Sequence, residues 1–543
     1  MLTAARADAL STAGLWQNKL LTDFVDPHAE SHGGAIAIVE QNSMFGTANQ
    51  TSFAELQSRS IRIACEFRER GIAPGDVVAV QLPNWWHYAA IYLACVRIGA
   101  VINPLMPIFR ERELSYMLGF ANARVFITSQ NFRGFDYPSM AYTLARDLPQ
   151  LEHVFVVDDG TRNDTFDQLT ARPWEREIDY TREFRELTSS PNDVTEIMYT
   201  SGTTGQPKGV MHTANTLICK ALLATELFKL NEQDVIFMGS PLAHQTGFMY
   251  AMVLSLYNRS KFVMQDIWQA DEAVELVARE GCSITLGATP FLSDLLNSAD
   301  ASPADISSLR LFLCAGAPIP SALIERAQRS LPSLYVMSAW GMTEMGIATA
   351  TYPGDSQDKV INTDGRALPH QQVRVVDEQG QIVDHDIEGR LQSRCATHFI
   401  GYLKRPEAYE VDDEGWLETG DNARMDVDGY IRITGRSKDI IIRGGENIPV
   451  VEIEELLYRH EAIEDCAIVA MPDKRLGERG CAFVTLKDGS EFTFDTMISY
   501  LLEHRMSKQY LPERLEIITE FPRTPSGKIQ KFVLRERASK FAS

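Results

Sequence analysis

Short apolar runs alternate with helical patterns along most of this chain, and that alternation limits the possible folds more than any other feature. Five such runs are each followed by a turn and a helical pattern. They cover residues 76–82, 154–157, 235–238, 284–286 and 311–314. Buried strands that alternate with helices are typical of α/β layers with mostly parallel sheets. Because such sheets bind ligands beyond the carboxyl ends of their strands, we expect a site at those ends.

The last hundred residues follow a different pattern. Apolar residues at helical spacing predict a helix over residues 450–457 and a second one over 494–505. Strand-like runs cover residues 467–471, 481–486 and 515–518. This composition predicts a compact α+β unit, and the polar, glycine-flanked segment 435–439 is a natural boundary. We therefore expect a large N-terminal domain of layered sheets and helices over residues 1–436 and a smaller α+β domain over residues 437–543.

Charge and hydropathy exclude several classes of function. The 543 residues include 52 Lys and Arg against 73 Asp and Glu, so the formal net charge is −21. A chain this acidic lacks the basic face of a general nucleic-acid or anionic-membrane binder. The most apolar stretch, residues 88–109, is interrupted by Arg97 and Asn103, so we expect no transmembrane segment.

The cysteines and the two ends of the chain favour a cytoplasmic protein. The eight cysteines are scattered and form no Cys-x-x-Cys pair, which is typical of reduced thiols. The first residues lack the apolar core of a secretory signal, and the last four are no peroxisomal or endoplasmic-reticulum address. The sequence leaves an oligomer possible.

The strongest local motif is a loop rich in glycine and hydroxyl residues over residues 199–209. Glycines allow the backbone to aim several N–H groups at one anion, and Lys208 adds a positive charge. The loop therefore has the composition of a phosphate-binding site, although an ordinary surface loop is the alternative. It is not the P-loop of nucleoside triphosphatases, because Gly209 follows Lys208 where that pattern requires Ser or Thr.

Four further motifs follow in order along the chain. They are Trp340-Gly-Met-Thr-Glu344, Gly415-Trp-Leu-Glu-Thr-Gly-Asp421, residues 430–439 and residues 522–528. Taken singly, each has a plain structural interpretation. Asp421 could be a turn residue, Glu344 a helix cap, and Lys528 part of a solvated basic tail. Trp340 and His244 could likewise be ordinary core residues. That all of these motifs occur in one chain is hard to obtain by chance, so together they indicate a common functional site.

With residues 200–209, these motifs resemble those of the adenylate-forming superfamily of acyl-CoA synthetases, peptide-synthetase adenylation domains and luciferases. The likeness spans Thr200 to Lys528. Within the superfamily the chain is most similar to ligases of short or medium fatty acids and of alicyclic acids such as cyclohexanecarboxylate. The resemblance implies that a carboxylate attacks the α-phosphate of ATP, pyrophosphate leaves, and a thiol then displaces AMP.

The resemblance also assigns residues to the nucleotide. Glu344 would ligate Mg²⁺, Thr343 would bond the α-phosphate, and Lys528 would bind the carboxylate and α-phosphate oxygens. Trp340 would stack on adenine, Asp421 would accept the ribose hydroxyls, and Arg436 would bind the ribose or phosphate side. The β- and γ-phosphates would be held by Thr200, Ser201, Gly202, Thr203, Thr204, Gly205 and Lys208. The remaining nucleotide contacts would come from Gly316, Ala317, Pro318, Gly341 and Met342.

The same resemblance implies that the small domain adopts two orientations relative to the large one. The small domain would rotate after adenylation and withdraw Lys528, with Lys438 as the hinge. Gly444, Gly445 and Glu446 would then border the pantetheine tunnel of CoA.

The acyl pocket would adjoin the nucleotide and be lined by apolar residues. The resemblance places His244, Phe248, residues 287–291, Ala315, Gly316 and Gly341 there. Acetate ligases carry a bulky Trp at the position of Gly341, so glycine here favours a larger acid. No charged side chain lies in this set, which favours a hydrophobic monocarboxylate over an amino acid.

The sequence therefore predicts an AMP-forming acyl-CoA synthetase that uses ATP, Mg²⁺, CoA and a hydrophobic carboxylic acid. Three alternatives stay open. They are an adenylating enzyme that loads a carrier-protein phosphopantetheine, a luciferase-like monooxygenase, and a non-catalytic nucleotide-binding regulator.

Overall fold

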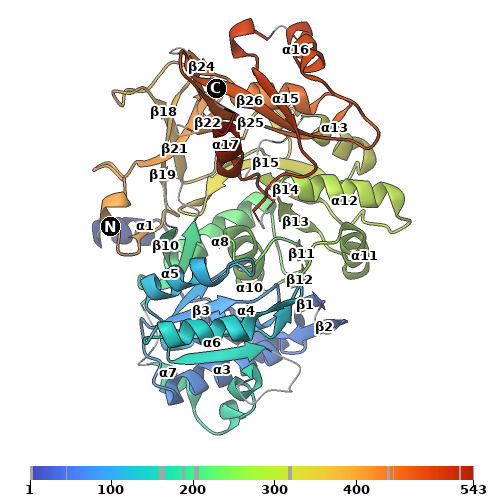
Figure 1. Ribbon diagram of the computed structural model, residues 1–543. Helices are drawn as coiled ribbons and strands as arrows, with labels where there is room; N and C mark the ends of the chain where they lie inside the picture. Colours follow the sequence, from blue (N-terminus) through green and yellow to red (C-terminus); the bar gives the residue numbers. More distant parts are fainter. Residues whose placement is uncertain are drawn as a thin grey trace.

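The computed structural model describes residues 4–541 except 44–45, 158–164, 186, 188–189, 201–206, 316–318, 320, 437–440, 444–445, 505 and 525–526. Figure 1 shows the N-terminal α/β part, in blue and cyan, beneath a green-to-yellow α/β part, with the red C-terminal residues at the top. Two mainly parallel sheets organise the first two parts, as the alternation of strands and helices predicts.

The first sheet carries the strands that will matter for the site. Its centre is parallel, and antiparallel strands lie at both edges. The order is β17 (Arg366–Ala367), β16 (Gly346–Ala350), β15 (Tyr335–Met342), β14 (Leu311–Ala315), β13 (Ile284–Gly287), β11 (Val235–Met238), β12 (Lys261–Gln265), β1 (Ile36–Asn42), β2 (Thr47–Ser52).

The second sheet is parallel apart from the strands at one end. The order is β20 (Gly401–Tyr402), β10 (Lys208–Thr213), β9 (Val194–Thr200), β4 (Val101–Pro104), β3 (Val77–Gln81), β5 (Ala123–Ser129), β8 (His153–Val157).

Apolar helices fill the space between these two sheets. Helix α4 (His87–Ile98) is buried on every side and ends at Gly99, which adopts a φ of 72°. With α8 (Ala214–Phe228) and the π-helical segment Phe248–Val253, it forms a core that reaches both sheets. The outer faces are covered by α11 (Ala270–Glu280), α12 (Thr289–Ala301) and α13 (Ser321–Ser330) on the first sheet, and by α5 (Glu111–Ala121) and α6 (Tyr137–Asp147) on the second.

The remaining helices and short strands lie around this framework. The helices are α1 (Ala4–Thr12), α2 (Thr22–His32), α3 (Phe53–Glu69), α7 (Tyr180–Arg185), α9 (Gln245–Gly247), α10 (Leu254–Asn258) and α14 (Gln357–Asn362), and the 3-10 turns are Phe166–Leu169, Trp174–Arg176, Pro406–Ala408 and Lys508–Tyr510. A small hairpin pairs β6 (Asn131–Phe132) with β7 (Phe135–Asp136).

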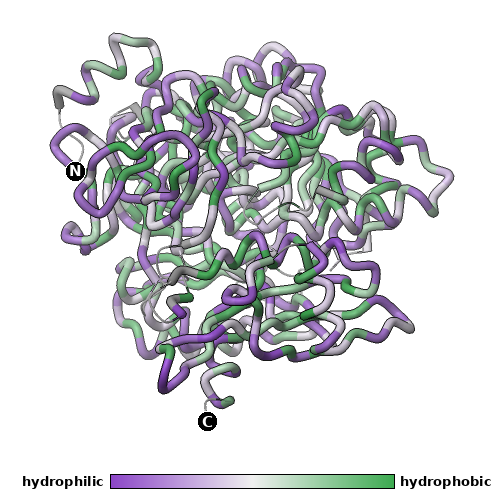
Figure 2. The backbone as a smooth tube through the Cα atoms, turned by 90° about the horizontal axis from the view of Figure 1, so that it is seen from above, coloured by the Kyte–Doolittle hydropathy of each residue, from purple (hydrophilic) through white to green (hydrophobic). Residues whose placement is uncertain are grey.

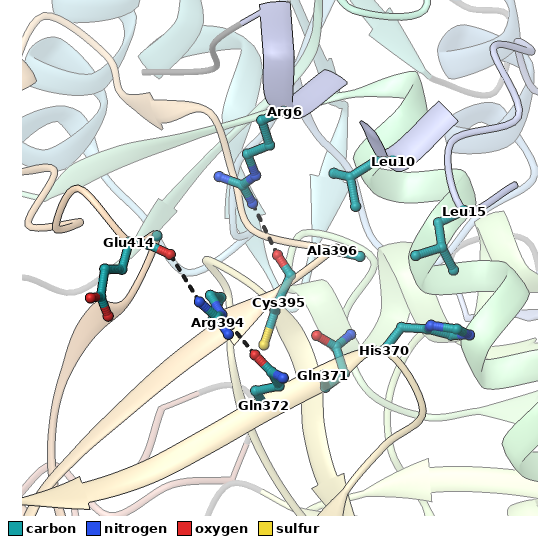
Figure 3. A pocket seen from close by; sticks show the side chains of 11 residues that line it. Arg6, Leu10, Leu15, His370, Gln371, Gln372, Arg394, Cys395, Ala396 and Glu414 are labelled. Carbon is teal, nitrogen blue, oxygen red and sulfur yellow. Dashed lines mark hydrogen bonds between the residues drawn. The ribbon is translucent and has the colours of Figure 1, made fainter. Parts of the chain in front are cut away.

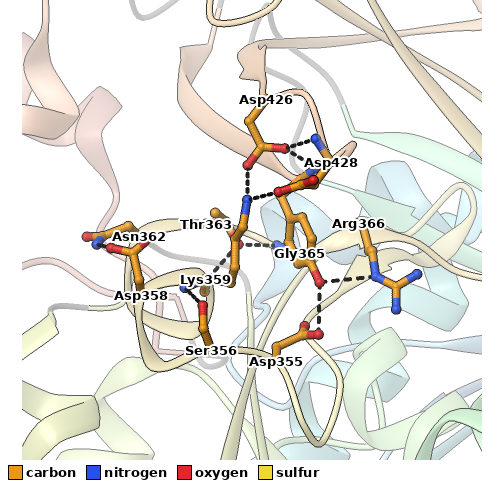
Figure 4. Close-up of polar contacts among 11 residues, drawn as sticks. Asp355, Ser356, Asp358, Lys359, Asn362, Thr363, Gly365, Arg366, Asp426 and Asp428 are labelled. Carbon is orange, nitrogen blue, oxygen red and sulfur yellow. Dashed lines mark hydrogen bonds and ion pairs between the residues drawn. The ribbon is translucent and has the colours of Figure 1, made fainter.

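A third sheet departs from the predicted alternation. It is antiparallel throughout, in the order β18 (Gln371–Val376), β19 (Gly389–Cys395), β21 (Leu417–Met425), β22 (Ile431–Arg436). Polar contacts connect it to α14 and the first sheet. Lys359 of α14 binds Asp426 at 2.6 Å and Asp428 at 2.9 Å (Figure 4). Arg366 of β17 donates to the Tyr430 hydroxyl at 3.1 Å. The alternation of strands and helices in the sequence did not predict this third sheet, which becomes evident only from the tertiary structure.

The C-terminal residues form the α+β unit that the sequence predicts. Its sheet has the order β24 (Glu446–Ile448), β23 (Ile441–Arg443), β26 (Gly477–Leu486), β25 (Ile463–Asp473), and β27 (Arg514–Ile517) pairs with β26. Helices α15 (Val450–Tyr458), α16 (Phe494–Glu503) and α17 (Lys531–Ser539) pack on it. The predicted boundary falls next to residues 437–440, which lie outside the described residues, so the division at 436/437 stays a prediction.

The predicted elements agree closely with the observed ones. All five strand runs of the large domain are strands, and the two C-terminal helices begin where expected. All eight cysteines are buried and free of disulfides, as their scatter predicts. Among the described helices, none has the length and apolar character needed to cross a membrane. Seen from above, many outer loops are hydrophilic and hydrophobic stretches run inside (Figure 2).

Candidate active site

The predicted site residues of the large domain lie at the carboxyl ends of neighbouring strands of the first sheet. His244 follows β11, Phe291 follows β13, and Thr343 and Glu344 follow β15. Residues 316–318, which follow β14, lie outside the described residues. This is the edge at which an α/β sheet binds ligands, so the topology brings together residues that are a hundred positions apart.

The turn that carries Thr343 and Glu344 is held by its backbone. The Met345 amide donates to the Met342 carbonyl at 3.1 Å, and the Phe399 amide donates to the Glu344 carbonyl at 2.7 Å. A Cβ atom at Gly341 would lie 2.1 Å from the Gly346 carbonyl oxygen. The close approach of β15 and β16 therefore requires glycine at 341. Its lack of a side chain thus has a backbone cause besides the room that it was expected to leave for an acyl group.

Glu344 belongs to a small polar cluster. Its side chain is buried, and the Tyr402 hydroxyl donates to its Oε1 at 2.7 Å. The Lys208 ammonium lies 4.7 Å from the centre of the Tyr402 ring. Burial, together with the negative charge of Glu344, raises the pKa of Tyr402. Tyr402 thus connects the lysine of the predicted phosphate loop to the predicted Mg²⁺ ligand.

This cluster suits a magnesium ion that arrives with a nucleotide. Mg²⁺ prefers oxygen ligands and is held in such sites by one or two carboxylates, with water and substrate phosphates completing its shell. Glu344 supplies one carboxylate in a partly protected position. Within the described parts of the chain, no group of three or more His, Cys, Asp and Glu side chains could form a cage of protein ligands alone.

Trp340 and Asp421 are joined directly. The Trp340 indole N–H donates to Asp421 Oδ2 at 2.9 Å, and both side chains are buried. Asp421 also donates its backbone amide to the Thr419 hydroxyl and pairs across the strands with Arg436. Asp421 is therefore a strand residue with a long-range partner rather than a turn residue. The sequence motifs place both residues at the nucleotide, but they do not predict this bond.

His244 is a neutral hydrogen-bond donor at the predicted acyl side. Its Nδ1 lies 3.2 Å from the backbone N–H of Thr246, which can only donate. The ring proton therefore sits on Nε2. Burial, and to a smaller extent the charge of Lys528, lowers the pKa of His244 to about 3. The imidazole is neutral at physiological pH, and Lys528 is near enough to act on it.

Lys528 is brought to the large domain by the loop that precedes it. A Cβ atom at Gly527 would lie 3.5 Å from Phe291 Cε2 and 3.6 Å from Ala288 Cβ, which is ordinary contact distance. The Lys528 amide donates to the Thr524 hydroxyl at 3.0 Å. The two domains are thus arranged with the C-terminal lysine loop against the strand ends that carry His244.

Asn84 is a positioning residue that the sequence motifs missed. Its buried amide donates to the carbonyls of Ser240 and Gln265, both at 3.0 Å, and accepts from the Leu242 amide at 2.8 Å. These bonds fix the loop that leads to His244. A polar residue between Leu82 and two tryptophans is the signal that could have identified it.

A second set of missed residues lies buried behind the Thr343 turn. Glu196 of β9 accepts from Gln245 at 2.9 Å, and Lys220 of α8 lies 3.0 Å from His212 of β10. Burial raises the pKa of Glu196 and lowers the pKa of Lys220, and the opposite charge of each counteracts this effect. Charged residues within the apolar segments 194–199 and 214–224 were the signal in the sequence.

Several predicted residues cannot be placed. The phosphate loop is described only at its ends, where Thr200 and Lys208 pair across β9 and β10. Arg436 and Glu446 are placed by their backbone in β22 and β24. The following predicted residues lie outside the described ones: Ser201, Gly202, Thr203, Thr204, Gly205, Gly316, Ala317, Pro318, Lys438, Gly444, Gly445.

A pocket of about 430 Å³ lies elsewhere, between α1 and the third sheet. Figure 3 shows Arg6, Leu10 and Leu15 from the N-terminal segment facing Arg394 and Cys395 of β19. None of the predicted site residues that the structure describes lines it. Arg6 donates to the Cys395 carbonyl at 2.9 Å, and Arg394 binds Gln372 and the Glu414 carbonyl, so both arginines have partners within the protein.

Comparison with known proteins agrees with this geometry. Residues 25–403 match the AMP-binding enzyme family, and residues 452–528 match the AMP-binding enzyme C-terminal domain. The chain is 36% identical over 537 residues to the medium-chain fatty-acid–CoA ligase of Escherichia coli, which covers 98% of this chain and 92% of that protein. It is 30% identical over 537 residues to the 2,3-dihydroxybenzoate-AMP ligase of Bacillus subtilis, which covers 98% and 96%. The ATP-bound MatB structure from Rhodopseudomonas palustris superimposes with a TM-score of 0.84 at 26% identity, covering 96% of this chain and 100% of that one.

Proposed function

Because the chain belongs to the AMP-binding enzyme family and has the two-domain adenylate-forming fold, we propose that it is an AMP-forming acyl-CoA synthetase for a hydrophobic carboxylic acid. Short-chain, medium-chain and alicyclic acids are the proposed substrates. The observation that supports this proposal most is that the Lys528 loop of the small domain lies against Phe291 and Ala288 of the large domain, with Lys528 near His244. A protein that only binds nucleotide has no need for that lysine.

The proposed reaction has two steps. A carboxylate oxygen of the acid attacks the α-phosphorus of ATP, the bond to the β-phosphate breaks, and pyrophosphate leaves. The sulfur of CoA then attacks the acyl carbon, AMP leaves with its phosphate oxygen, and the thiol proton passes to solvent. Stabilising the charge on the α-phosphate is the main demand of the first step.

Each described site residue has a proposed part in the first step. Lys528 binds the carboxylate and α-phosphate oxygens, and Thr343 binds the α-phosphate. Lys208 binds the terminal phosphates. Glu344 is the proposed Mg²⁺ ligand, and Mg²⁺ when bound would neutralise phosphate charge. The Nε2–H of His244 is the donor available to an acyl oxygen.

The nucleoside would be held by Trp340 and Asp421, which are hydrogen-bonded to each other. Asp421 accepts the ribose hydroxyls, and its bond to Trp340 fixes the indole whose face would meet the adenine. Lys438 is the proposed hinge between domains 1–436 and 437–543. Gly444, Gly445 and Glu446 are proposed to border the CoA tunnel after the small domain has rotated.

The choice of acid rests on the described surroundings of His244 and on likeness. Phe248, Ala288 and Phe291 are apolar, and His244 is neutral, so these side chains offer no negative charge to an amino-acid ammonium. The name of the E. coli relative supports a medium-chain acid. The B. subtilis relative is named as an AMP ligase rather than a CoA ligase, so the second candidate, an adenylating enzyme that loads a carrier protein, stays open.

The test is the conversion of ATP to AMP with Mg²⁺ across a panel of acids, each with and without CoA. The panel holds acetate, hexanoate, decanoate, palmitate, cyclohexanecarboxylate, benzoate and 4-coumarate. We expect CoA-dependent AMP formation to peak at hexanoate, decanoate or cyclohexanecarboxylate. Pyrophosphate exchange without CoA-dependent turnover would instead favour carrier-protein loading. No exchange with any acid would overturn the proposal.

A further inference from the structure

Three polar side chains lie buried behind the turn that carries Thr343 and Glu344, and none of them has a part in the proposed reaction. They come from three consecutive elements: Glu196 from β9, His212 from β10 and Lys220 from α8. Glu196 and His212 are 0% exposed and Lys220 is 2% exposed. Burial of such groups is costly, so their contacts deserve a specific account.

His212 binds the turn directly. Its Nε2 lies 2.9 Å from the carbonyl oxygen of Thr343, and since a carbonyl can only accept, His212 donates. The other ring nitrogen, Nδ1, lies 3.2 Å from the Thr216 hydroxyl, whose proton it shares with the Thr213 carbonyl at 2.9 Å. The ring is therefore fixed at both nitrogens, in the orientation that aims one N–H at the turn.

Lys220 reaches the same carbonyl from the helix beneath. Its ammonium makes a long bond of 3.5 Å to the Thr343 oxygen and lies 3.0 Å from His212 Nε2. Its stem packs under Gly346, where a Cβ atom would meet Lys220 Cδ at 3.2 Å. Tyr250 completes this support, because the Ile347 amide donates to its hydroxyl at 2.6 Å.

Binding at this carbonyl has a consequence for the two site residues. The peptide between Thr343 and Glu344 is planar, so holding its carbonyl helps to fix the positions of the two Cα atoms from which these side chains start. The next carbonyl, that of Glu344, accepts from the Phe399 amide. The turn is thus held at two successive peptides, those that follow Thr343 and Glu344.

The charges in this layer balance one another. Burial lowers the pKa of Lys220. Among the neighbouring charges that oppose this effect, Glu196 has the largest influence and Glu344 the second largest. Glu196 is bound in turn by Gln245, the neighbour of His244. The layer therefore extends from the predicted acyl side to the predicted phosphate side of the site.

We propose that His212 and Lys220 are positioning residues for adenylation, which hold the Thr343 carbonyl and so aim Thr343 and Glu344 at the α-phosphate and its metal ion. This inference rests on the proposed function. It differs from a purely structural role for the buried layer, in which the loss of either residue would lower stability without separating the two half-reactions.

The test compares the half-reactions in the full chain. Hexanoate-dependent pyrophosphate exchange reports adenylation, and the reaction of isolated hexanoyl-AMP with CoA reports thioester formation. In His212→Leu we expect the kcat of exchange to fall about 10- to 100-fold, because small misplacements of reacting groups cost that much. We expect the KM for hexanoate and the rate of thioester formation to stay within about twofold of wild type.

Two further variants separate positioning from folding. His212→Gln keeps an N–H donor at the turn, and we expect it to recover exchange to within about fivefold of wild type. Lys220→Met combined with Glu196→Gln removes both buried charges together, so it avoids an unpaired carboxylate, and we expect reduced exchange with normal thioester formation. His87→Leu is the control, because His87 is also buried but packs on Trp86 instead of the turn.

Binding gives a readout besides activity. We expect the rise in unfolding temperature caused by ATP with Mg²⁺ to be smaller in His212→Leu than in His87→Leu. Equal losses in both half-reactions, or full exchange in a folded His212→Leu chain, would overturn the inference. Equal losses in His212→Leu and His212→Gln would also overturn it. A wild-type chain without exchange with any acid would overturn the proposed function, and this inference would fall with it.

Discussion

The Thr343–Glu344 turn and the Lys528 loop bring their residues to one site in opposite ways. The turn is bound by β10, by the segment before β20 and by Tyr250, all within the large domain. The Lys528 loop is held inside the small domain, where Arg523 donates to the Gly527 carbonyl at 2.8 Å, and it faces the large domain across Phe291 and Ala288. Thr343 and Glu344 are thus held within the large domain, whereas Lys528 belongs to the small domain, which we propose rotates after adenylation.

Removing the lysine gives the largest expected separation of the two steps. In Lys528→Ala we expect hexanoate-dependent pyrophosphate exchange to fall about 10²- to 10³-fold, because a charge on the reacting oxygens is lost. Thioester formation from hexanoyl-AMP should change little. Exchange that persists in this variant, or in a chain acetylated at Lys528, would refute the role assigned to the lysine.

Restricting the hinge should reverse this pattern. Lys438 lies outside the described residues, and its role is proposed from the motif at 430–439. Proline there fixes φ, so Lys438→Pro should hinder rotation of the small domain. Measured separately, the half-reactions should lose activity unequally, with thioester formation the more reduced. Equal loss of both steps would count against a hinge at this residue.

Removing the buried hydrogen bonds of Asn84 should destabilise the large domain. In Asn84→Leu, the amide of Leu242 and the carbonyls of Ser240 and Gln265 lose their buried partner. We expect the free energy of unfolding to fall by about 2–4 kcal/mol in urea titrations. Asn362→Leu is the control, because Asn362 is exposed and should change stability by less than about 0.5 kcal/mol. Equal stability of the two variants would contradict the role of Asn84.

Removing an ion pair between the two domains should have the smallest effect of these substitutions on activity. Arg432 of β22 binds Glu455 of α15 at 3.0 Å, and Arg459 binds the same carboxylate at 2.9 Å from within the small domain. Arg432→Ala should slow pyrophosphate exchange by about two- to fivefold, and less at high salt. Arg459→Ala is the matched control and should leave exchange unchanged. An equal effect of both variants would show that this pair does not favour the observed domain arrangement.

The sequence by itself determined the layered α/β fold, the C-terminal α+β unit and the order of the motifs. Each of these depends on local pattern: buried runs such as residues 235–238, the glycine that ends α4, and the hydroxyl and glycine content of residues 199–209. A resemblance among motifs also identified Thr343, Glu344 and Lys528 as a set, although they belong to two domains.

Only the tertiary structure decided how these residues are held. The bond from Trp340 to Asp421, the support of Thr343 by His212 and Lys220, and the three bonds of Asn84 join residues far apart in the chain. The same holds for Gly341, whose missing side chain is explained by the Gly346 carbonyl opposite it. No local pattern encodes such contacts, because burial and distance arise only when separate elements pack together.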